Sequence, residues 1–323
     1  IAMVPQWDLL TMLTDEASRY PHFQLRMNAE VVGLVRSHGT VTGVRYRDCS
    51  SGSSSGSSSG FEGSEGSEGS EREVRALLTV AADGRHSVLR RAAGLRLREF
   101  GAPIDVAWFR LPRVQTDRQD TFLRVGAAGM IAAINRTTYW QLARLVPKGG
   151  YDALQAGGAD ALRQSVTDLL PFLADRAAEI DFDRVRLLSV RVDRLRRWHR
   201  PGFLCIGDAA HAMSPIGGVG INMAIQDAVA AANLLYTPLS RGLIRDRDLA
   251  AVRRRRCLAT AAVQTVQLGI QNLLIEPALR GRQPSIRALE TARRFPLFRR
   301  LLARAVGYGP LPEHVRTPPS CRS

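Results

Sequence analysis

The residues of this 323-residue chain that are best suited to chemistry lie between positions 200 and 235. A short apolar stretch at 203–206 predicts a buried strand, and Gly207 and Asp208 end it. A carboxylate should therefore stand at the carboxyl end of a strand, where open α/β sheets bind ligands. A proline- and glycine-rich loop follows, and from about Gly220 an alanine-rich stretch predicts a helix. The loop lets the backbone approach a flat ligand, and the helix start offers free N–H groups and a positive dipole end.

A carboxylate followed 12–14 residues later by a helix start suits a flavin. Asp208 can accept hydrogen bonds from ribityl hydroxyls, and the helix start can face the pyrimidine end of the isoalloxazine, where negative charge gathers on reduction. Two alternatives stay open at this point. Asp208 can instead be a structural turn or cap carboxylate, and His211 is either a proton-transfer group or a packed, hydrogen-bonded histidine.

The run G-D-A-A-H at 207–211, followed by a proline, G-I-N and D-A, resembles the second FAD fingerprint of the para-hydroxybenzoate-hydroxylase-like flavoprotein monooxygenases. The resemblance implies that Asp208 holds the ribityl chain and that Pro215 lies beside the flavin ring. It also implies that backbone N–H groups at the helix start contact a flavin carbonyl. The cofactor-binding residues implied in this segment are Gly207, Asp208, Pro215, Gly220, Ile221 and Asn222.

A second segment, 80–90, resembles the D-G-x-x-S-x-x-R motif of the same family, again after a predicted strand. Asp83 and Gly84 form its turn, Ser87 can cap the helix that follows, and Gly94 suits the end of that helix. In the family this motif lies near the FAD pyrophosphate and is implicated in nicotinamide-cofactor binding. Asp83 and Gly84 are therefore further candidates for cofactor binding.

Near the start of the chain, residues 4–9 stand where the family carries R/Q-x-x-L, which makes Gln6 a candidate contact to FAD. Val31 is a weaker candidate for a strand beside the adenine. The family also begins with a strand, a G-x-G-x-x-G loop and a helix that bind the ADP pyrophosphate. No such unit occurs in this sequence, so we expect an N-terminally truncated copy of the domain that holds FAD less firmly.

The elements that must position these motifs predict an α/β fold in four parts. Residues 1–100 and 195–240 form a Rossmann-like, three-layer FAD-binding domain, 101–194 form a mostly antiparallel substrate sheet, and 241–323 form a basic helical tail. A helix is predicted near 5–17, with Leu9, Leu10, Leu13 and Ala17 as its apolar stripe. Further strands are predicted at 23–27, 31–35, 40–47, 73–82, 105–111, 129–135, 139–146 and 184–192, with a helical stretch at 152–178 broken near Pro171.

Two features of this expected fold depend on which way side chains point from a helix or a strand. On the helix after Gly220, the expected packing side comprises Met223, Ala224, Ala228, Ala231 and Leu235. Four aromatic side chains of the substrate sheet must divide between a pocket and a core, and the sequence does not sort them: Trp108, Phe109, Tyr139 and Trp140.

Between two predicted hairpin arms, residues 50–71 consist of Ser, Gly and Glu units with one aromatic residue, so we expect a disordered insert. The net charge is +15, but residues 241–323 alone carry 17 arginines and five acidic residues. Because no nucleic-acid-binding signature is present, the charge does not predict specific nucleic-acid binding. The basic tail can instead touch anionic membrane weakly. Four widely spaced cysteines predict neither disulfides nor a metal site, and no uninterrupted apolar run suggests a spanning helix.

The resemblance implies an FAD-dependent oxidoreductase, most simply a monooxygenase that uses NAD(P)H and O₂ to hydroxylate a small apolar or aromatic substrate. FAD supplies the reactive chemistry in such enzymes, which agrees with the lack of a protein nucleophile motif. Two alternatives fit the same residues: an FAD-dependent reductase or dehydrogenase without oxygen chemistry, and an inactive fragment that binds no flavin. The expected location is the cytoplasm, with membrane-peripheral contact as an addition.

Overall fold

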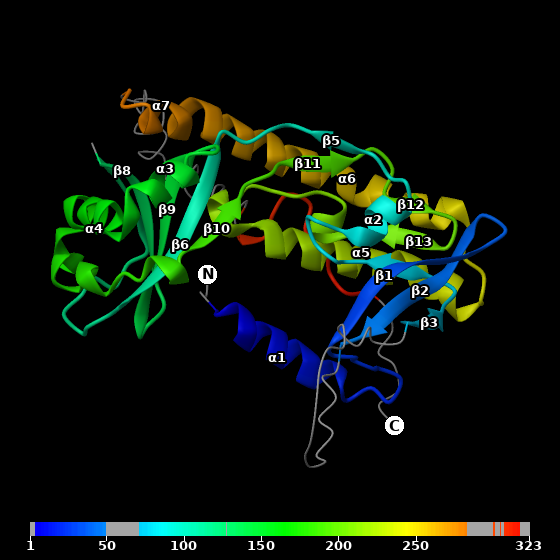
Figure 1. Ribbon diagram of the computed structural model, residues 1–323. Helices are drawn as coiled ribbons and strands as arrows, with labels where there is room; N and C mark the ends of the chain where they lie inside the picture. Colours follow the sequence, from blue (N-terminus) through cyan, green and yellow to red (C-terminus); the bar gives the residue numbers. More distant parts are fainter. Residues whose placement is uncertain are drawn as a thin grey trace, which may run out of the picture.

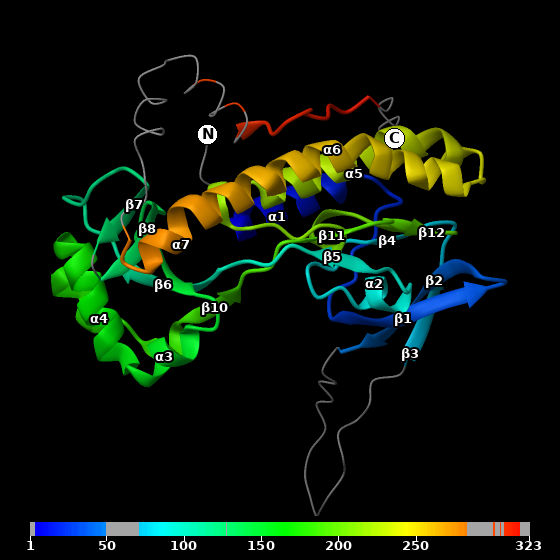
Figure 2. The ribbon, with the colours of Figure 1, turned by 90° about the horizontal axis from the view of Figure 1, so that it is seen from above.

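The computed structural model describes residues 4–49, 71–126, 128–282, 300, 304 and 307–316. These residues form two parts joined by extended strands and one long helical segment (Figures 1 and 2). We call them the flavin part, which contains both predicted FAD motifs, and the substrate part, which contains residues 101–190. Residues 50–70 of the expected insert and most of the basic tail after residue 282 lie outside the described residues, whereas Glu71, expected as the last residue of the insert, begins a strand.

The flavin part is built on a small sheet of β12 (His199–Arg200), β13 (Phe203–Cys205) and β4 (Thr79–Ala81), in that order. The buried strand expected at 203–206 is confirmed. β13 and β4 are parallel, with Cys205 opposite Ala81, so both strands end at the same edge of the sheet. Helices α2 (Val88–Ala92), α5 (Gly220–Ser240) and α6 (Asp246–Ile270) enclose its core, which includes Trp198 and Phe203.

A second, antiparallel sheet of β1 (Ala29–Ser37), β2 (Thr40–Asp48) and β3 (Glu71–Arg75) flanks this core. It corrects two expectations. Residues 23–27 form no strand, and the single strand expected at 73–82 is two strands in different sheets. The chain leaves the hairpin after β3, where the Ala76 N–H donates to Thr42, and joins β13 as β4. Both stretches have strand-like composition, so only the change of pairing partner separates them.

The substrate part is a five-stranded antiparallel sheet, as expected. Its order is β10 (Arg186–Ser189), β6 (Ile104–Pro112), β9 (Tyr139–Pro147), β8 (Gly129–Asn135) and β7 (Phe122–Gly126). One face is covered by α3 (Tyr151–Ala156), α4 (Gly158–Leu169) and 3₁₀ turns at Pro171–Glu179 and Phe182–Arg184. The break expected near Pro171 is confirmed, and Gly157–Gly158 adds another.

The aromatic side chains of this sheet sort by the alternation of its strands. Phe109 and Trp140 belong to the core beneath α4, whereas Trp108 packs on the opposite face with Met130 and Leu145. Tyr139 shares the Trp108 face, since β9 places Ala143 there at even spacing. That face is turned toward the flavin part, because Ile216 packs against the same apolar cluster.

A two-stranded ribbon of β5 (Leu97–Glu99) and β11 (Asp193–Leu195) links the parts, and α6 runs above it beside α5 (Figure 2). α6 continues through a π-helical turn, Gln271–Ile275, into α7 (Glu276–Leu279), which contacts β8 and β9. This 34-residue segment is long and apolar enough to cross a bilayer. Its buried face, however, combines apolar residues such as Leu249 and Val252 with polar side chains that are hydrogen-bonded to the flavin part.

Helices α5 and α1 pack differently from the sequence expectation. On α5, Ala228 is exposed, and the buried side includes Gln226 and Asp227 instead. The predicted N-terminal helix is present as α1 (Gln6–Ala17), but within the described structure it buries no side chain, and its stripe residues Leu10 and Leu13 are exposed. A helix without buried residues gains little free energy from packing, and the segment just before α1 is held by the Arg136 side chain, which donates to the Val4 carbonyl.

Candidate functional site

The two FAD motifs meet where the parallel strands β4 and β13 end. Asp83 follows β4 by two residues, and Asp208 follows β13 by three, within a 3₁₀ turn at Gly207–Ala209. The Arg85 guanidinium lies 3.5 Å from the Asp208 carboxylate and also donates to the Ser189 carbonyl, at 3.4 Å. Arg85 therefore joins the two motifs and reaches the last strand of the substrate sheet.

Local capping holds the first motif rigid. The Ser87 hydroxyl accepts from the Arg90 N–H at 2.9 Å, which confirms it as the cap of α2, and the Asp83 carboxylate accepts from the Leu89 N–H at 3.2 Å. Gly94 has a φ of +63° just past the helix, as predicted. The buried Arg90 side chain donates to Ala209 and to Arg85 carbonyls at 2.9 and 2.8 Å. Arg90 thus fastens the two motifs to each other.

The turn that carries Asp208 requires a glycine before it. Gly207 has a φ of +57°, and a Cβ at this position would lie 3.0 Å from the Cβ of Ala224 on α5. This close approach brings the turn against the second turn of α5. The Asp208 side chain remains one-third exposed, and among the described residues its charged partner is Arg85, at 3.5 Å. It is therefore accessible to the hydroxyl groups of a bound ligand.

The glycine loop before α5 leaves its backbone open. Gly217 and Gly218, in a 3₁₀ turn at Ile216–Gly218, have φ values of +80° and +64°, and no described heavy atom lies within 4 Å of a Cβ built on Gly218 or Gly220. No described side chain caps the start of α5, and Ile221 is half exposed. The N–H groups of the first turn thus have no acceptor among the described residues and can donate to a ligand. An open glycine backbone beside an accessible carboxylate fits the FAD predicted from the fingerprint.

Behind this turn lies a buried network that the sequence did not reveal. The Asp227 carboxylate, fully buried on α5, accepts from the Gly207 N–H at 3.0 Å and from Arg256 Nε at 3.0 Å, and lies 2.5 Å from His211 Nε2. Burial alone would raise the pKa of Asp227, but the charge of His211 and these hydrogen bonds lower it. In the sequence, the D-A pair that ends the fingerprint, Asp227 and Ala228, could have indicated this network.

The same network decides between the two interpretations of His211. Its ring is 1% exposed, pairs with Asp227 and lies 5.0 Å from the Trp198 ring. His211 is therefore a packed, hydrogen-bonded histidine that supports the Asp208 turn. Arg256 differs from the other arginines expected in the basic tail. It belongs to a run of four arginines in the sequence, but its side chain is fully buried. It also donates to the Leu311 carbonyl in the C-terminal segment.

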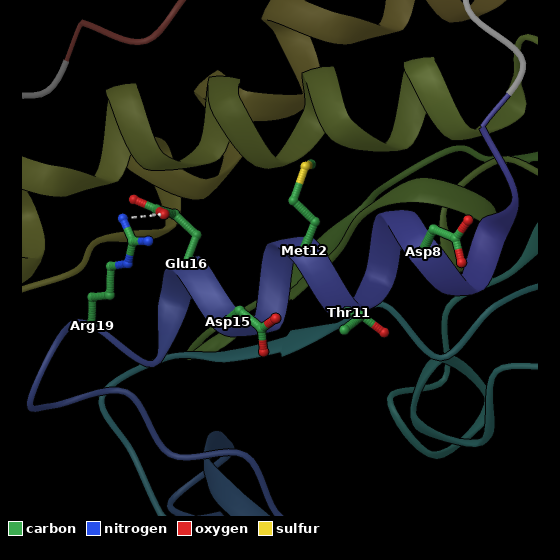
Figure 3. A pocket seen from close by; sticks show the side chains of 6 residues that line it. All are labelled: Asp8, Thr11, Met12, Asp15, Glu16 and Arg19. Atoms are coloured by element: carbon green, nitrogen blue, oxygen red, sulfur yellow. Dashed lines mark ion pairs between the residues drawn. The ribbon is translucent and has the colours of Figure 1, made fainter.

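Gln6 and Val31 do not join this constellation. Gln6 is the exposed first residue of α1, which lies across from α5, and Val31 lies half-buried on β1 (Figure 1). Figure 3 shows a shallow hollow along α1, with Met12 pointing toward α5 and Glu16 paired with Arg19 at 2.8 Å. None of the predicted cofactor residues lines this hollow. Its lining consists of Asp8, Thr11, Met12, Asp15, Glu16 and Arg19. The strand-end geometry defines the site better than this hollow.

Comparison with known proteins agrees with this geometry. The model of the FAD binding domain family matches residues 1–266. A 6-methylpretetramide 4-monooxygenase from Streptomyces rimosus is 33% identical over 97% of this chain and 71% of its own length. A flavin-dependent brominase has a TM-score of 0.72 at 17% identity, over 94% of this chain and 70% of its own. Anhydrotetracycline hydroxylase from Streptomyces rimosus has a TM-score of 0.66 at 20% identity, over 94% and 56%.

The chain thus belongs to the FAD-binding-domain family of flavoprotein monooxygenases, as the resemblance implied. It spans about seven-tenths of the length of the monooxygenase relative. The α/β fold with an antiparallel substrate sheet is that of its structural neighbours, and FAD is the cofactor of the family.

Proposed function

We propose that this chain contributes the FAD and substrate sites of a monooxygenase that hydroxylates a flat aromatic small molecule. The single observation that carries the proposal is the meeting of Asp208 and the open start of α5 at the shared edge of β4 and β13. The relative that acts on 6-methylpretetramide supports a fused-ring aromatic substrate.

In this proposal, Asp208 accepts hydrogen bonds from the ribityl chain, and the N–H groups of Ile221 and Asn222 bind a flavin carbonyl. The Asn222 side chain does not compete, because it donates to the Gly307 carbonyl at 3.3 Å. Pro215 and the glycine loop provide a close, flat surface. When bound, FAD supplies the redox and oxygen chemistry, with NAD(P)H as the reductant and O₂ as the oxidant. The protein orients it and excludes water.

The face of the substrate sheet that carries Trp108 is the proposed substrate surface. It combines apolar side chains with a cationic group, since the Arg110 guanidinium lies 4.8 Å above the Tyr139 ring. Arg136 donates to Gln141 at 3.0 Å and to the Val4 carbonyl at 3.2 Å, which ties this face to the start of α1. An aromatic substrate with a phenolic or carboxylate oxygen fits such a surface.

The proposal is tested with the purified protein, FAD, NAD(P)H and a panel of fused-ring phenols. We expect a bound-flavin absorption spectrum, substrate-stimulated NAD(P)H oxidation, and a product that carries one labelled atom from ¹⁸O₂. A reduced product without label would identify the reductase alternative, and a halogenated product would identify chemistry like that of the brominase neighbour. Protein that stays colourless after FAD titration would contradict the proposal.

A pair of adjacent residues tests the substrate surface. Trp108→Ala should raise KM while FAD affinity stays unchanged, because Trp108 faces the flavin part. Phe109→Ala, one residue along, should instead lower stability by about 3–5 kcal/mol, because Phe109 lies in the core under α4. Equal KM values for wild type and Trp108→Ala would contradict this assignment.

We further propose a cytoplasmic location with weak contact to anionic membrane through the basic residues after 241. The support is compositional, 17 arginines against five acidic residues. Co-sedimentation with anionic and with neutral vesicles tests it. Binding should occur only to anionic vesicles and should disappear as ionic strength rises.

A further inference from the structure

The buried side of α6 carries a polar stripe. Five side chains at helical spacing of three or four residues are almost fully buried there: Arg256, Thr260, Gln264, Gln267 and Gln271. A packed helix normally buries an apolar stripe, because unpaired polar groups cost free energy in the interior. The three glutamines therefore need an explanation.

Each glutamine amide donates to the backbone or side chain of the loop between Asp208 and α5. Gln264 Nε2 donates to the Ala212 carbonyl at 2.9 Å and to the Asp193 carbonyl at 2.8 Å. Gln267 Nε2 donates to the Ser214 and Ile216 carbonyls, at 2.9 and 2.8 Å. Gln271 Nε2 donates to the Ser214 hydroxyl at 2.9 Å. Three alternate residues of the loop are thus held by one helix.

These contacts fix the orientation of two of the three amides. A carbonyl oxygen accepts and cannot donate, so the Nε2 groups of Gln264 and Gln267 must face the loop. The three Oε1 atoms are buried and have no hydrogen-bond partner among the described residues. A stripe with acceptors left over is not the arrangement that best stabilises a helix interface. It does satisfy the carbonyls of a loop that forms no sheet or long helix of its own.

The loop is the part of the site that most needs such support. It joins the Asp208 turn to the glycines before α5, and a cofactor site must be held within a fraction of an ångström to bind well. The glycines that follow it, Gly217 and Gly218, allow several backbone conformations. The family match ends at residue 266, so Gln267 and Gln271 lie beyond the matched domain.

We propose that Gln264, Gln267 and Gln271 are positioning residues of the flavin site, which hold the loop at 212–216 through its carbonyls and the Ser214 hydroxyl so that the Asp208 turn and the start of α5 face the cofactor together. The proposal rests on the proposed function for the identity of the ligand. It adds that α6, outside both FAD motifs, determines how well the loop is formed.

The decisive variant is Gln267→Glu, which keeps the shape and removes the amide donors. As a carboxylate it faces two carbonyl oxygens, and burial favours its protonated form, which can donate once. We expect FAD to bind about tenfold or more weakly at about pH 8, with a smaller loss at about pH 5.5. The matched control is Asn272→Asp, the same amide-to-carboxylate change on the exposed side of the same helical segment. It should bind FAD as wild type does at both pH values.

A second readout needs no FAD. Hydrogen exchange of the amides between 207 and 222, followed by mass spectrometry on the cofactor-free protein, should be faster in Gln267→Glu than in Asn272→Asp at about pH 8. Gln271→Met, which loses one hydrogen bond, should fold and show the same effect more weakly.

The outcomes separate the two proposals. If the wild type binds no FAD, the proposed function is wrong, and the exchange experiment still decides whether the glutamines hold the loop. If wild type and a folded Gln267→Glu exchange equally at 207–222, the positioning role is wrong. Unchanged FAD affinity at about pH 8 would overturn it as well.

Discussion

Two buried carboxylate–arginine networks in the described part of the molecule have similar chemistry and different consequences. In the substrate part, Asp117 accepts from Arg176 at 2.6 and 2.9 Å and from Trp140 Nε1 at 2.9 Å. In the flavin part, Asp227 accepts from Arg256, His211 and the Gly207 N–H. The partners of Asp117 all lie within the substrate part. Asp227 is bonded directly to the turn that carries Asp208.

The difference shows that burial and charge pairing do not by themselves identify a functional group. Both carboxylates have lowered pKa values, Asp117 chiefly through hydrogen bonds from Arg176 and Asp227 through His211, Arg256 and Gly207 against the opposing effect of burial. What distinguishes them is the backbone each one holds. Loss of Asp117 should affect folding alone, whereas loss of Asp227 should affect both folding and the cofactor site.

The largest expected effect is that of Asp227→Asn. It removes the nearer of the two carboxylates that face the fully buried Arg256 and leaves only Glu313, 3.8 Å from the guanidinium, and breaking a buried pair typically costs about 3–5 kcal/mol. It also weakens the hydrogen bond to Gly207, so FAD affinity should fall. Urea unfolding and FAD titration measure the two effects. A variant that is destabilised but binds FAD with native affinity would show that Asp227, like Asp117, affects only folding.

Asp117→Asn is the matched control from the other network. It should lose stability by a similar amount, about 3–5 kcal/mol, because Arg176 and Asp117 are both nearly fully buried. The FAD affinity of the folded fraction should remain that of wild type. A weaker FAD affinity at temperatures where the variant is folded would show that the networks are coupled.

Asp208→Ala tests the site without the network. One charge-assisted hydrogen bond contributes about 1.5–3 kcal/mol, so FAD affinity should fall tenfold or more. The side chain is one-third exposed and its Arg85 pair is long, so the melting temperature of the cofactor-free protein should hardly change. Unchanged affinity in a fluorescence titration would contradict the role of Asp208.

Acid should separate the networks further. The pKa of Asp117 is lowered from its usual 3.8 to about 2 in the folded protein. The ionised Asp117 therefore stabilises the folded state fully at pH values above 3.8, and this stabilisation is lost as the pH falls through about 2. The loss should amount to about 2 kcal/mol. Acid unfolding followed by tryptophan fluorescence should show a later transition in wild type than in Asp117→Asn. Coincident transitions would mean that another group controls acid stability.

The smallest effect is expected far from both networks. β2 and β3 are paired in register, with Arg47 opposite Glu71, independently of the residues between them. Replacing 50–70 by an Asn-Gly turn should therefore leave the melting temperature unchanged, because closure entropy grows only logarithmically with loop length. A fall of several degrees would show that the insert contributes to the fold.

The sequence by itself determined the features that depend on local spacing. The Ser87 cap, the glycine after α2 and the carboxylate after β13 follow from neighbouring residues, and the antiparallel substrate sheet follows from alternation. These choices are made within a few residues of chain, where steric and hydrogen-bonding preferences act directly. The two fingerprint segments therefore lie together at the shared strand ends, whereas Gln6 lies apart on α1, and the contacts of these residues with FAD stay predictions.

Only the tertiary structure decided which polar residues are buried and what they hold. In the sequence, Arg256 belongs to a run of four arginines, and Gln264 and Gln267 appear as ordinary polar positions of a helix. Their burial depends on α6 crossing the loop at 212–216, a contact between segments some fifty residues apart. Likewise, strand alternation puts the adjacent Trp108 and Phe109 on opposite faces of the sheet, and only the packing of α4 decides which of the two faces it covers. Side-chain pattern limits the choices, and long-range packing selects among them.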